Sequence, residues 1–332
     1  MGLFKSEVVV LKDSTASKDY LAKLEALYAI APPEVKPELE KEIKITQAGI
    51  VGEDNIMYEL KNSGMDLVVL HDLYIQAGDL SAQIDFFVQS PKKGIFIECK
   101  NLYGDIEINS NGDFIRTFSI HGRKIKEGIY SPITQNQRHM EVFRQAKLDG
   151  SGVVMQAALA AGFKMFYVPL VVLANPKTVL NDKNAPTDIK DKVIRADQLA
   201  NTIKAINAKT FQARDSLSEM IKYGNAFLSY CSEYDGFSAK YDELEKKVRD
   251  AQEQHEQQEK AKAEKESKAK DALVNEPTKP DVAPNLAPSP EILFCPRCGQ
   301  QLVLRTAKKG DRAGQQFYGC SAYPRCRYIK NL

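Results

Sequence analysis

The sequence predicts a mixed α/β fold of the α+β kind, in which helices flank a mixed sheet and a small metal-binding module follows. Short β-rich segments separated by turn residues lie between two helical regions. Four of the six cysteines lie in the last 38 residues, beyond a charged stretch and a proline-rich stretch. The chain has 332 residues, of which 43% are hydrophobic, and this is enough for two domains and a linker.

The individual elements follow from the spacing of apolar residues and from turn signals. A helical region interrupted by Pro32, Pro33 and Pro37 comes first, and a further helix is expected to end near Gly64. The strand-like segments are DLVVLHDLYI, QIDFFVQS, GIFIECKN, DIEINS and DFIRTFSI. After these, the segments predict a helix in TQNQRHMEVFRQAKL, a buried strand in MFYVPLVVLAN, and a strand and helix in DKVIRADQLANTIKAINA.

Changes in composition mark the expected domains. They are an N-terminal helical segment at 1–44, the sheet-containing domain at 45–180, a helical extension at 181–235, a charged helix and proline-rich linker at 236–291, and a zinc finger at 292–332. The helical extension is expected either to enlarge the sheet-containing domain or to form a small cap.

The charged stretch at 240–270 predicts a solvated single helix or a flexible spacer. Its apolar stripe does not extend beyond Leu244 and Val248. A coiled-coil partner helix is the less favoured alternative, because the core positions are not apolar over three heptads.

Two close pairs of cysteines predict a structural zinc site. Two residues separate Cys295 from Cys298, and five separate Cys320 from Cys326. Tetrahedral Zn²⁺ prefers four soft ligands, which two such pairs provide with little strain. The module is too short for a convincing hydrophobic core, so metal binding is expected to supply much of its folding free energy. Four free thiols or disulfides are the alternative, which a cytosolic cysteine pattern disfavours.

Basic and aromatic residues are interleaved in this module. Eight basic residues stand against the single acid Asp311 after Glu291. Such a surface suits phosphates and stacked bases, as in the binding of single-stranded nucleic acid. The expected nucleic-acid-binding residues are Arg297, Lys308, Lys309, Arg312, Arg325, Arg327, Tyr318 and Tyr323. A structural or protein-binding ribbon, whose rings only pack its core, is the alternative.

A strand with charged residues at its end predicts a second metal site. In GIFIECKN, strand alternation places Phe96, Glu98 and Lys100 on one face. Asp85 lies within a nearby apolar strand, where a carboxylate is costly unless it is paired or binds a metal. Two carboxylates on neighbouring strands are able to share one Mg²⁺, and Lys100 is then placed to orient or deprotonate water during phosphodiester hydrolysis. For the Glu-x-Lys pattern alone, an ion pair on an edge strand is the alternative.

The C-terminal module resembles the four-cysteine zinc finger of type IA DNA topoisomerases. The matching segments are CPRCG, LVLR and FYGCSAYPRC, and the five-residue spacing in the second pair is typical of that family. The resemblance covers the last 38 residues and implies DNA binding with a preference for single strands. It does not extend to the catalytic regions of a topoisomerase.

The order of helix, strands, helix and strand resembles that of the PD-(D/E)XK nucleases. Within that superfamily, residues 45–180 resemble the NERD (nuclease-related) domain, whose three signature blocks match GIVGEDNIMYEL, QIDFFVQSPKKGIFIECKNLYGDI and SPITQNQRHMEVFR. The resemblance implies a restriction-endonuclease-like fold and a nuclease site that depends on Mg²⁺ or Mn²⁺. The implied site residues are Glu53, Asp85, Glu98, Lys100 and Gln135, with Asp85 and Glu98 as the ligands of the catalytic metal.

Two neighbouring positions bear on this resemblance. Ile84 stands where the superfamily name has proline, a position that accepts other residues, and Cys99 is expected to present its carbonyl group to the metal. Simpler interpretations also exist for the accessory residues. Glu53 is alternatively a solvated acid in a first helical turn, and Gln135 and His139 are alternatively part of an exposed helix face.

The function expected from these features is that of a metal-dependent DNA endonuclease or nickase with a tethered DNA-binding finger, which raises the local concentration of DNA. A non-catalytic nucleic-acid-binding protein that keeps the nuclease fold is the first alternative, and an interaction scaffold built on the charged helix is the second. The N-terminal residues do not resemble a secretory signal and no segment reads as a membrane span, so a cytoplasmic protein without membrane contact is expected, nucleoid-associated if bacterial. The net charge of +2 says little about partners.

Overall fold

The computed structural model describes residues 6–149, 152–233, 236–274, 293–307 and 314–331. The chain forms two compact units, Met1–Ala263 and Glu264–Leu332. The proline-rich stretch predicted as a linker lies outside the described residues, as do Lys308, Lys309 and Arg312.

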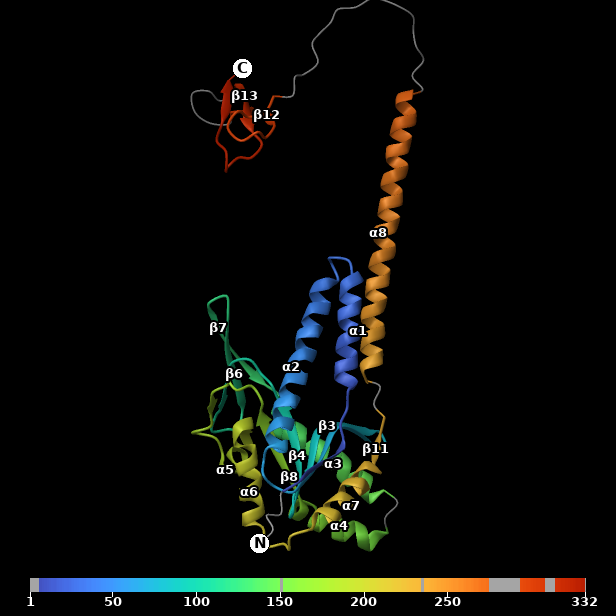
Figure 1. The fold of residues 1–332 in the computed structure, drawn as a ribbon, viewed down its shortest axis with the longest axis vertical. Coiled ribbons are helices and arrows are strands. Elements are labelled where there is room, and N and C mark those ends of the chain that lie inside the picture. The colour runs from blue at the N-terminus through green and yellow to red at the C-terminus, as the bar shows by residue number, and fades with distance from the viewer. Residues whose placement is uncertain (1–5, 150–151, 234–235, 275–292, 308–313, 332) are drawn as a thin grey trace, which may run out of the picture. The chain divides into compact units, whose positions relative to one another are not determined.

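A mixed sheet forms the centre of the first unit (Figure 1). Its strands are β1 (Val8–Lys12), β2 (Leu67–Ala77), β3 (Leu80–Gln89), β4 (Gly94–Lys100), β8 (Tyr167–Leu173), β10 (Val193–Arg195) and β11 (Cys231–Ser232). The order is β1-β2-β3-β4-β8-β10, and β11 pairs with β2. β2, β3 and β4 are antiparallel neighbours, whereas β8 pairs in parallel with β4 and β10. The predicted mixed sheet is therefore confirmed, and β4 is a central strand rather than an edge strand.

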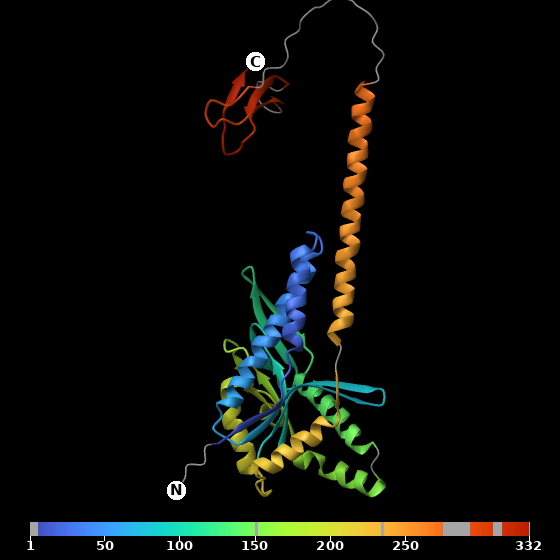
Figure 2. The same ribbon diagram turned by 45° about the vertical axis from the view of Figure 1, so that its right-hand side comes forward.

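Helices cover both faces of this sheet (Figures 1 and 2). The covering helices are α2 (Lys36–Lys61) and α6 (Leu199–Lys209) on one face, and α3 (Pro132–Leu148) and α7 (Leu217–Leu228) on the other. Ile95 and Ile97 of β4 belong to the core under α2 and α6, and Phe96 belongs to the core under α3 and α7. The alternation predicted for this strand is thus observed, and both of its faces are buried.

Strands from outside the predicted sheet-containing domain join the same sheet. β1 lies in the segment expected to be helical, ahead of α1 (Ala16–Ile30), and pairs in parallel with β2. β10 and β11 come from the segment 181–235, which therefore enlarges the domain instead of forming a separate cap. The strand predicted in DKVIRADQLANTIKAINA is β10, whereas β1 and β11 were not predicted, because they are short and short apolar runs cannot be assigned from periodicity alone.

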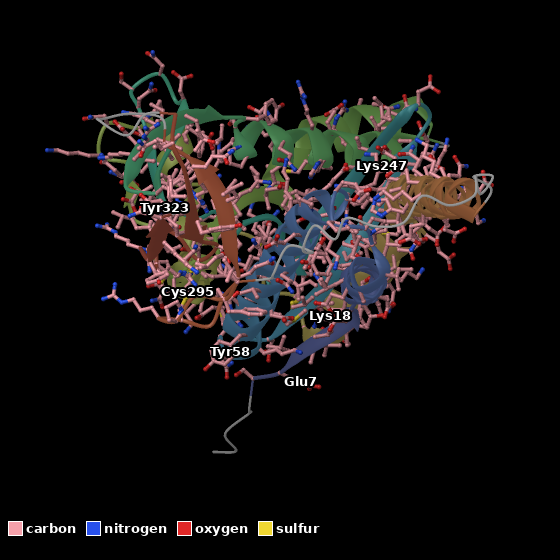
Figure 3. The ribbon with its side chains drawn as sticks, turned by 90° about the horizontal axis from the view of Figure 1, so that it is seen from above. Glu7, Lys18, Tyr58, Lys247, Cys295 and Tyr323 are labelled. Carbon is pink, nitrogen blue, oxygen red and sulfur yellow. The ribbon has the colours of Figure 1, made fainter. Side chains whose placement is uncertain are left out.

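The helix α8 (Gly236–Val274) corrects the expectation of a solvated helix for the first part of its length. Tyr241, Leu244, Val248 and Ala251 pack against α1 and α2 in one apolar cluster. Their spacing alternates between three and four residues, as in a coiled coil. Lys247 of α8, labelled in Figure 3, also pairs with an acid of α2 at 2.8 Å. The sequence criterion failed because tyrosine and the small residue alanine, rather than large aliphatic residues, complete the stripe.

A smaller sheet continues the chain beyond β4. Its strands, in order, are β7 (Arg123–Ile129), β6 (Phe114–Ile120), β5 (Asp105–Ile108) and β9 (Leu180–Asn181). The base of this sheet is buried, because Ile106, Ile108 and Phe114 pack against Val171 and Leu173 of β8. The sequence predicted β5 and β6 but not β7, whose residues are mostly charged and exposed.

The helix α3 is attached to the sheet by a buried amide. Asn136 Nδ2 donates to the backbone carbonyls of Phe96 at 2.9 Å and of Leu170 at 3.0 Å. Pro169, which has no N–H, lies opposite Phe96 in the parallel pairing of β4 and β8. The amide thus supplies donors where the backbone ladder lacks one, and it holds α3 against β4 two residues before Glu98.

We expect Asn136→Ala to lower the free energy of unfolding by about 2 kcal/mol, because two buried carbonyl oxygens lose a donor. Urea unfolding followed by circular dichroism measures this change. Gln137→Ala, at the exposed neighbouring position, is the control and is expected to change stability by less than about 0.5 kcal/mol. Equal stability of the two variants would show that the amide contributes nothing.

Candidate functional site

Polar side chains gather where β3 and β4 lie side by side. Phe86 of β3 is opposite Ile97 of β4, so the next residues along the two strands, Asp85 and Glu98, are neighbours. Asp85 Oδ2 accepts a hydrogen bond from the backbone N–H of Cys99 at 2.7 Å. The structure therefore brings the two predicted carboxylates together.

Glu98 is buried among groups that stabilise its charge. Its Oε1 lies 2.6 Å from Lys100 Nζ. Its Oε2 lies 3.4 Å from His139 Nδ1 but has no hydrogen-bond partner in the described part of the chain. Burial alone would raise the pKa of Glu98, but His139 and Lys100 outweigh it and lower the pKa. Glu98 is thus an anion with one buried oxygen left for a further partner.

Asp85 has the opposite electrostatic environment. Burial, and then the negative charge of Glu98, raise the pKa of Asp85 well above its ordinary value. The N–H of Cys99 and the charge of Lys100 oppose this shift without cancelling it. Two carboxyl groups that disfavour each other's ionisation are stabilised when a cation lies between them.

A third carboxylate comes from the middle of α2. Glu53 Oε2 lies 3.2 Å from His71 Nε2, and Asp13 Oδ1 lies 2.8 Å from the other nitrogen of the same ring. Burial lowers the pKa of His71, but Glu53 and Asp13 outweigh burial and raise it. Because α2 begins at Lys36, the interpretation of Glu53 as an acid of a first helical turn is wrong.

Close packing of α2 on the sheet allows Glu53 to reach this place. A β-carbon on Gly52 would lie 2.7 Å from Asn101 Cβ and 3.0 Å from Cys99 Sγ, which leaves no room for a side chain. Asn101 Nδ2 also donates to the carbonyl of Ala48 at 2.6 Å. A glycine and an amide therefore fix α2 beside the end of β4.

The second unit is built around the four cysteines. Its strands β12 (Leu302–Thr306), β13 (Gln316–Cys320) and β14 (Ile329–Asn331) form an antiparallel sheet. The four sulfur atoms lie within 4.8 Å of one another. The Cys295–Cys326 and Cys298–Cys320 sulfur distances are 3.8 and 3.3 Å, far longer than the roughly 2.05 Å of a disulfide. Disulfides are therefore excluded, and the cluster has the ligands of a tetrahedral metal site.

The environment of Cys295 favours a thiolate. Burial tends to raise the pKa of this thiol, but the backbone N–H groups of Arg297 and Cys298 outweigh it and lower the pKa to about 7. A thiolate is the form that binds Zn²⁺.

Residues 48–174 match the family model described as Nuclease-related domain. This chain carries a nuclease-related domain. Residues 294–332 match the family model described as Topoisomerase DNA binding C4 zinc finger, so the chain also carries a topoisomerase-type zinc ribbon. Both resemblances seen in the sequence are thus confirmed. The nuclease-related domain contains the carboxylates of β3 and β4, Lys100, Glu53 and the helix α3.

Curated relatives match over a short stretch. The protein named Uncharacterized protein YrdD of Escherichia coli (strain K12) is 47% identical over 38 residues, which are 11% of this chain and 18% of that protein. A protein of Haemophilus influenzae, named Uncharacterized protein, is 46% identical over 39 residues, 12% of this chain and 19% of its own length. The chain therefore spans less than a fifth of each relative. No solved structure matches the chain. Among the described residues, no helix combines the length and apolarity needed to cross a membrane.

The nuclease-related domain brings a histidine, not a glutamine, into contact with the carboxylates. His139 of α3 reaches Glu98, whereas no hydrogen bond joins this carboxylate to the half-buried Gln135, one turn earlier, in the part of the chain that the structure describes. His139 is therefore not part of a merely exposed helix face. His139 and His71 were not predicted as site residues. His139 lies within the signature block SPITQNQRHMEVFR, which was the available signal, whereas His71 lies outside the three blocks. Neither residue's partner could be identified from spacing, since each contact joins different elements.

The carboxylates of the nuclease-related domain fit a divalent cation. Among the described residues, Oε2 of Glu98 has a 3.4 Å ion-pair contact with His139 but no hydrogen bond, and burial and Glu98 raise the pKa of Asp85, so a cation beside the two carboxyl groups would stabilise their charges. Among the described residues, the four cysteines are the group in which three or more side-chain ligands lie within 4.8 Å of one another. The carboxylate site thus supplies fewer than three such side-chain ligands from the described residues. This is usual for Mg²⁺, which keeps several of its water ligands.

The aromatic residues of the zinc ribbon divide into two kinds. Tyr318 packs against the cysteine cluster and belongs to the ribbon's core. Tyr323, labelled in Figure 3, is 60% exposed, and the guanidinium of Arg305 lies 6.0 Å from its ring centroid. The core-packing alternative therefore describes Tyr318, whereas Tyr323 presents its ring to solvent.

Proposed function

We propose that this protein is a metal-dependent DNA endonuclease or nickase, with a zinc ribbon that binds DNA. The observation that carries the proposal is the group formed by Asp85, Glu98 and Lys100, in which one buried oxygen of Glu98 accepts no hydrogen bond among the described residues and has only a 3.4 Å ion-pair contact with His139. The matches to a nuclease-related domain and to a topoisomerase DNA-binding finger support it.

We assign each residue a role in this reaction. Asp85 and Glu98 are the ligands for Mg²⁺ or Mn²⁺, and the carbonyl of Cys99 is a third candidate ligand. A bound divalent ion would supply Lewis-acid stabilisation of the phosphate charge. Lys100, held 2.6 Å from Glu98, is placed to orient the attacking water and to balance negative charge on the phosphate. Water adds to phosphorus as the bond to one ester oxygen breaks, which leaves a phosphate monoester and a hydroxyl group.

The two histidines are positioning residues in this proposal. His139 holds Glu98 from α3, and His71 holds Glu53 from β2. Gln135, which lies on α3 one turn before His139, stays a candidate for contact with the scissile phosphate or with metal-bound water. In the zinc ribbon, the exposed Tyr323 and neighbouring basic residues such as Arg325 and Arg327 are the candidates for contact with single-stranded DNA.

A plasmid-nicking assay tests the proposal. We expect the full chain to convert supercoiled DNA to open circles with Mg²⁺ or Mn²⁺, and to leave it intact when these ions are omitted. Omission is preferable to a strong chelator, which would also remove zinc from the ribbon. DNA binding without any nicking under these conditions would reject the enzyme and favour a binding protein that keeps the nuclease fold.

A further inference from the structure

We propose that the β6–β7 hairpin is a DNA-binding arm, whose tip contacts the phosphates of double-stranded DNA beside the nuclease site. This inference rests on the proposed function, because it assigns a surface for the same substrate. The hairpin lies in the first unit and projects from its body in both ribbon views (Figures 1 and 2). None of the implied site residues lies in this hairpin.

The hairpin is built to leave the body of the domain. Phe114, at its base, is buried with Val171 and Leu173 of β8. Residues 119–124, at the tip, are all exposed. About six residues separate base and tip, a reach of about 20 Å. β5 pairs with β6 as far as Thr117, so the two-stranded part of the hairpin is residues 118–125. A short two-stranded ribbon gains little stability by itself, so this part calls for a function other than packing.

The tip is a tight turn with a defined geometry. His121 and Gly122 have φ values of 48° and 77°, and they join Ile120 to Arg123, which are paired across the strands. Two central residues with positive φ are the mark of a type I′ turn, which matches the twist of the flanking strands. The tip is therefore a two-residue turn with a defined backbone geometry and not a long loop.

The charge at the tip is positive and unpaired. Residues 119–126 contain Arg123, Lys124 and Lys126 and no acid. Lys126, nearer the base, pairs with Glu107 at 3.1 Å. Within the described part of the chain, no carboxylate lies within ion-pair distance of Arg123 or Lys124. The strand pairing also sets Ser119 opposite Lys124, so a hydroxyl group lies on the same face of the hairpin as the Lys124 side chain.

These donors match the chemistry of a nucleic-acid backbone. Phosphate oxygens accept hydrogen bonds from arginine, lysine and serine side chains. A two-stranded β-ribbon also has the width to enter the major groove of B-form DNA, whereas the major groove of an RNA duplex is too narrow for side chains. Double-stranded DNA is therefore the partner that the shape and the charge favour together.

The base of the arm is fixed to the end of the strand that carries Lys100. Only the loop Asn101–Gly104 separates β4 from β5. Arg116 Nε of β6 donates to the carbonyl of Tyr103 in this loop at 2.7 Å. Gly104 has a φ of 101°, and a β-carbon there would meet the backbone of Thr117. DNA bound by the arm would thus lie close to the end of β4, which carries Glu98 and Lys100.

The test compares DNA binding by full-length variants in an Asp85→Asn background, in which the proposed cleavage is disabled. Fluorescence anisotropy measures binding of a labelled DNA duplex over a range of salt concentrations. We expect Arg123→Ala/Lys124→Ala to raise the Kd for the duplex about tenfold, and to reduce the slope of log K against log salt by about 2. Binding of a single-stranded oligonucleotide, through the zinc ribbon, is expected to stay unchanged.

The matched control is Lys209→Ala/Arg214→Ala, which removes one lysine and one arginine from exposed positions at and after the end of α6. Equal duplex affinity and equal salt slopes for the two double variants would overturn the inference, and an acidic protein would then be the better partner for the hairpin. That result would not bear on the proposed nuclease activity, which plasmid nicking by the unmodified chain tests separately. Conversely, if the chain does not nick DNA but needs the hairpin to bind a duplex, only the proposed nuclease activity is rejected.

Discussion

Asp85→Asn and Lys100→Ala are each expected to reduce plasmid nicking by at least about a hundredfold. The asparagine keeps the volume of Asp85 and an acceptor for the N–H of Cys99, but it removes the charge that a divalent cation requires. The alanine removes the ammonium group that lies 2.6 Å from Glu98. Rates of open-circle formation with Mg²⁺ and with Mn²⁺ provide the measurement.

Metal binding separates the roles of these two residues. Calorimetric titration with Mn²⁺ is expected to show weaker binding for Asp85→Asn, because a ligand is lost, and retained binding for Lys100→Ala. The controls are Asp79→Asn and Lys41→Ala, which make the same changes at exposed positions. If both site variants nicked DNA at the rate of these controls, the catalytic assignment would be wrong.

Removing zinc is expected to unfold the second unit and leave the first unit intact. Among the described residues, few buried hydrophobic side chains surround the four cysteines, and Leu302 is the one aliphatic side chain in that cluster that is buried rather than partly buried. In such small modules metal binding supplies most of the folding free energy, about 10 kcal/mol or more. The first unit has its own apolar cores on both sides of its sheet and does not use these cysteines.

The variant Cys320→Ser tests the effect of zinc loss without a chelator. We expect the unmodified chain to hold one zinc ion and Cys320→Ser to lose it, together with most of its affinity for single-stranded DNA. Cys231→Ser is the control, because Cys231 lies in the first unit and outside the cluster. Atomic absorption gives the zinc content and anisotropy gives the DNA affinity. Full single-strand affinity in a zinc-free chain would contradict a DNA-binding role for the folded ribbon.

Several features could be predicted because their signals are local. The zinc ligands form two close pairs, and the alternation of Ile95, Phe96 and Ile97 is a property of one strand. The charged ends of β4 and the acid in β3 could be recognised for the same reason. Sequence resemblance then connected Glu53 to these positions, although the helix that carries it is longer than expected.

Other features depended on contacts between distant segments. The environment of Glu98 includes His139 from α3, and that of Glu53 includes His71 from β2, and no spacing rule links these pairs. The inner half of α8 was expected to be solvated because its stripe is weak, yet α1 and α2 provide the apolar partner surface. A weak stripe is sufficient when two other helices already bury most of the shared core.

The sequence by itself determined the chemistry of the zinc ribbon and of the proposed catalytic site: four thiols in pairs, and carboxylates with a lysine on consecutive strands. Side-chain type and short-range periodicity are contained in the order of residues, so these assignments needed no coordinates. Only the tertiary structure decided that Asp85 and Glu98 are neighbours, that a histidine flanks each of Glu98 and Glu53, and that a basic hairpin leaves the domain from the end of β4. Those facts depend on strand register and helix packing, which are set by the burial of the whole core and not by any single segment.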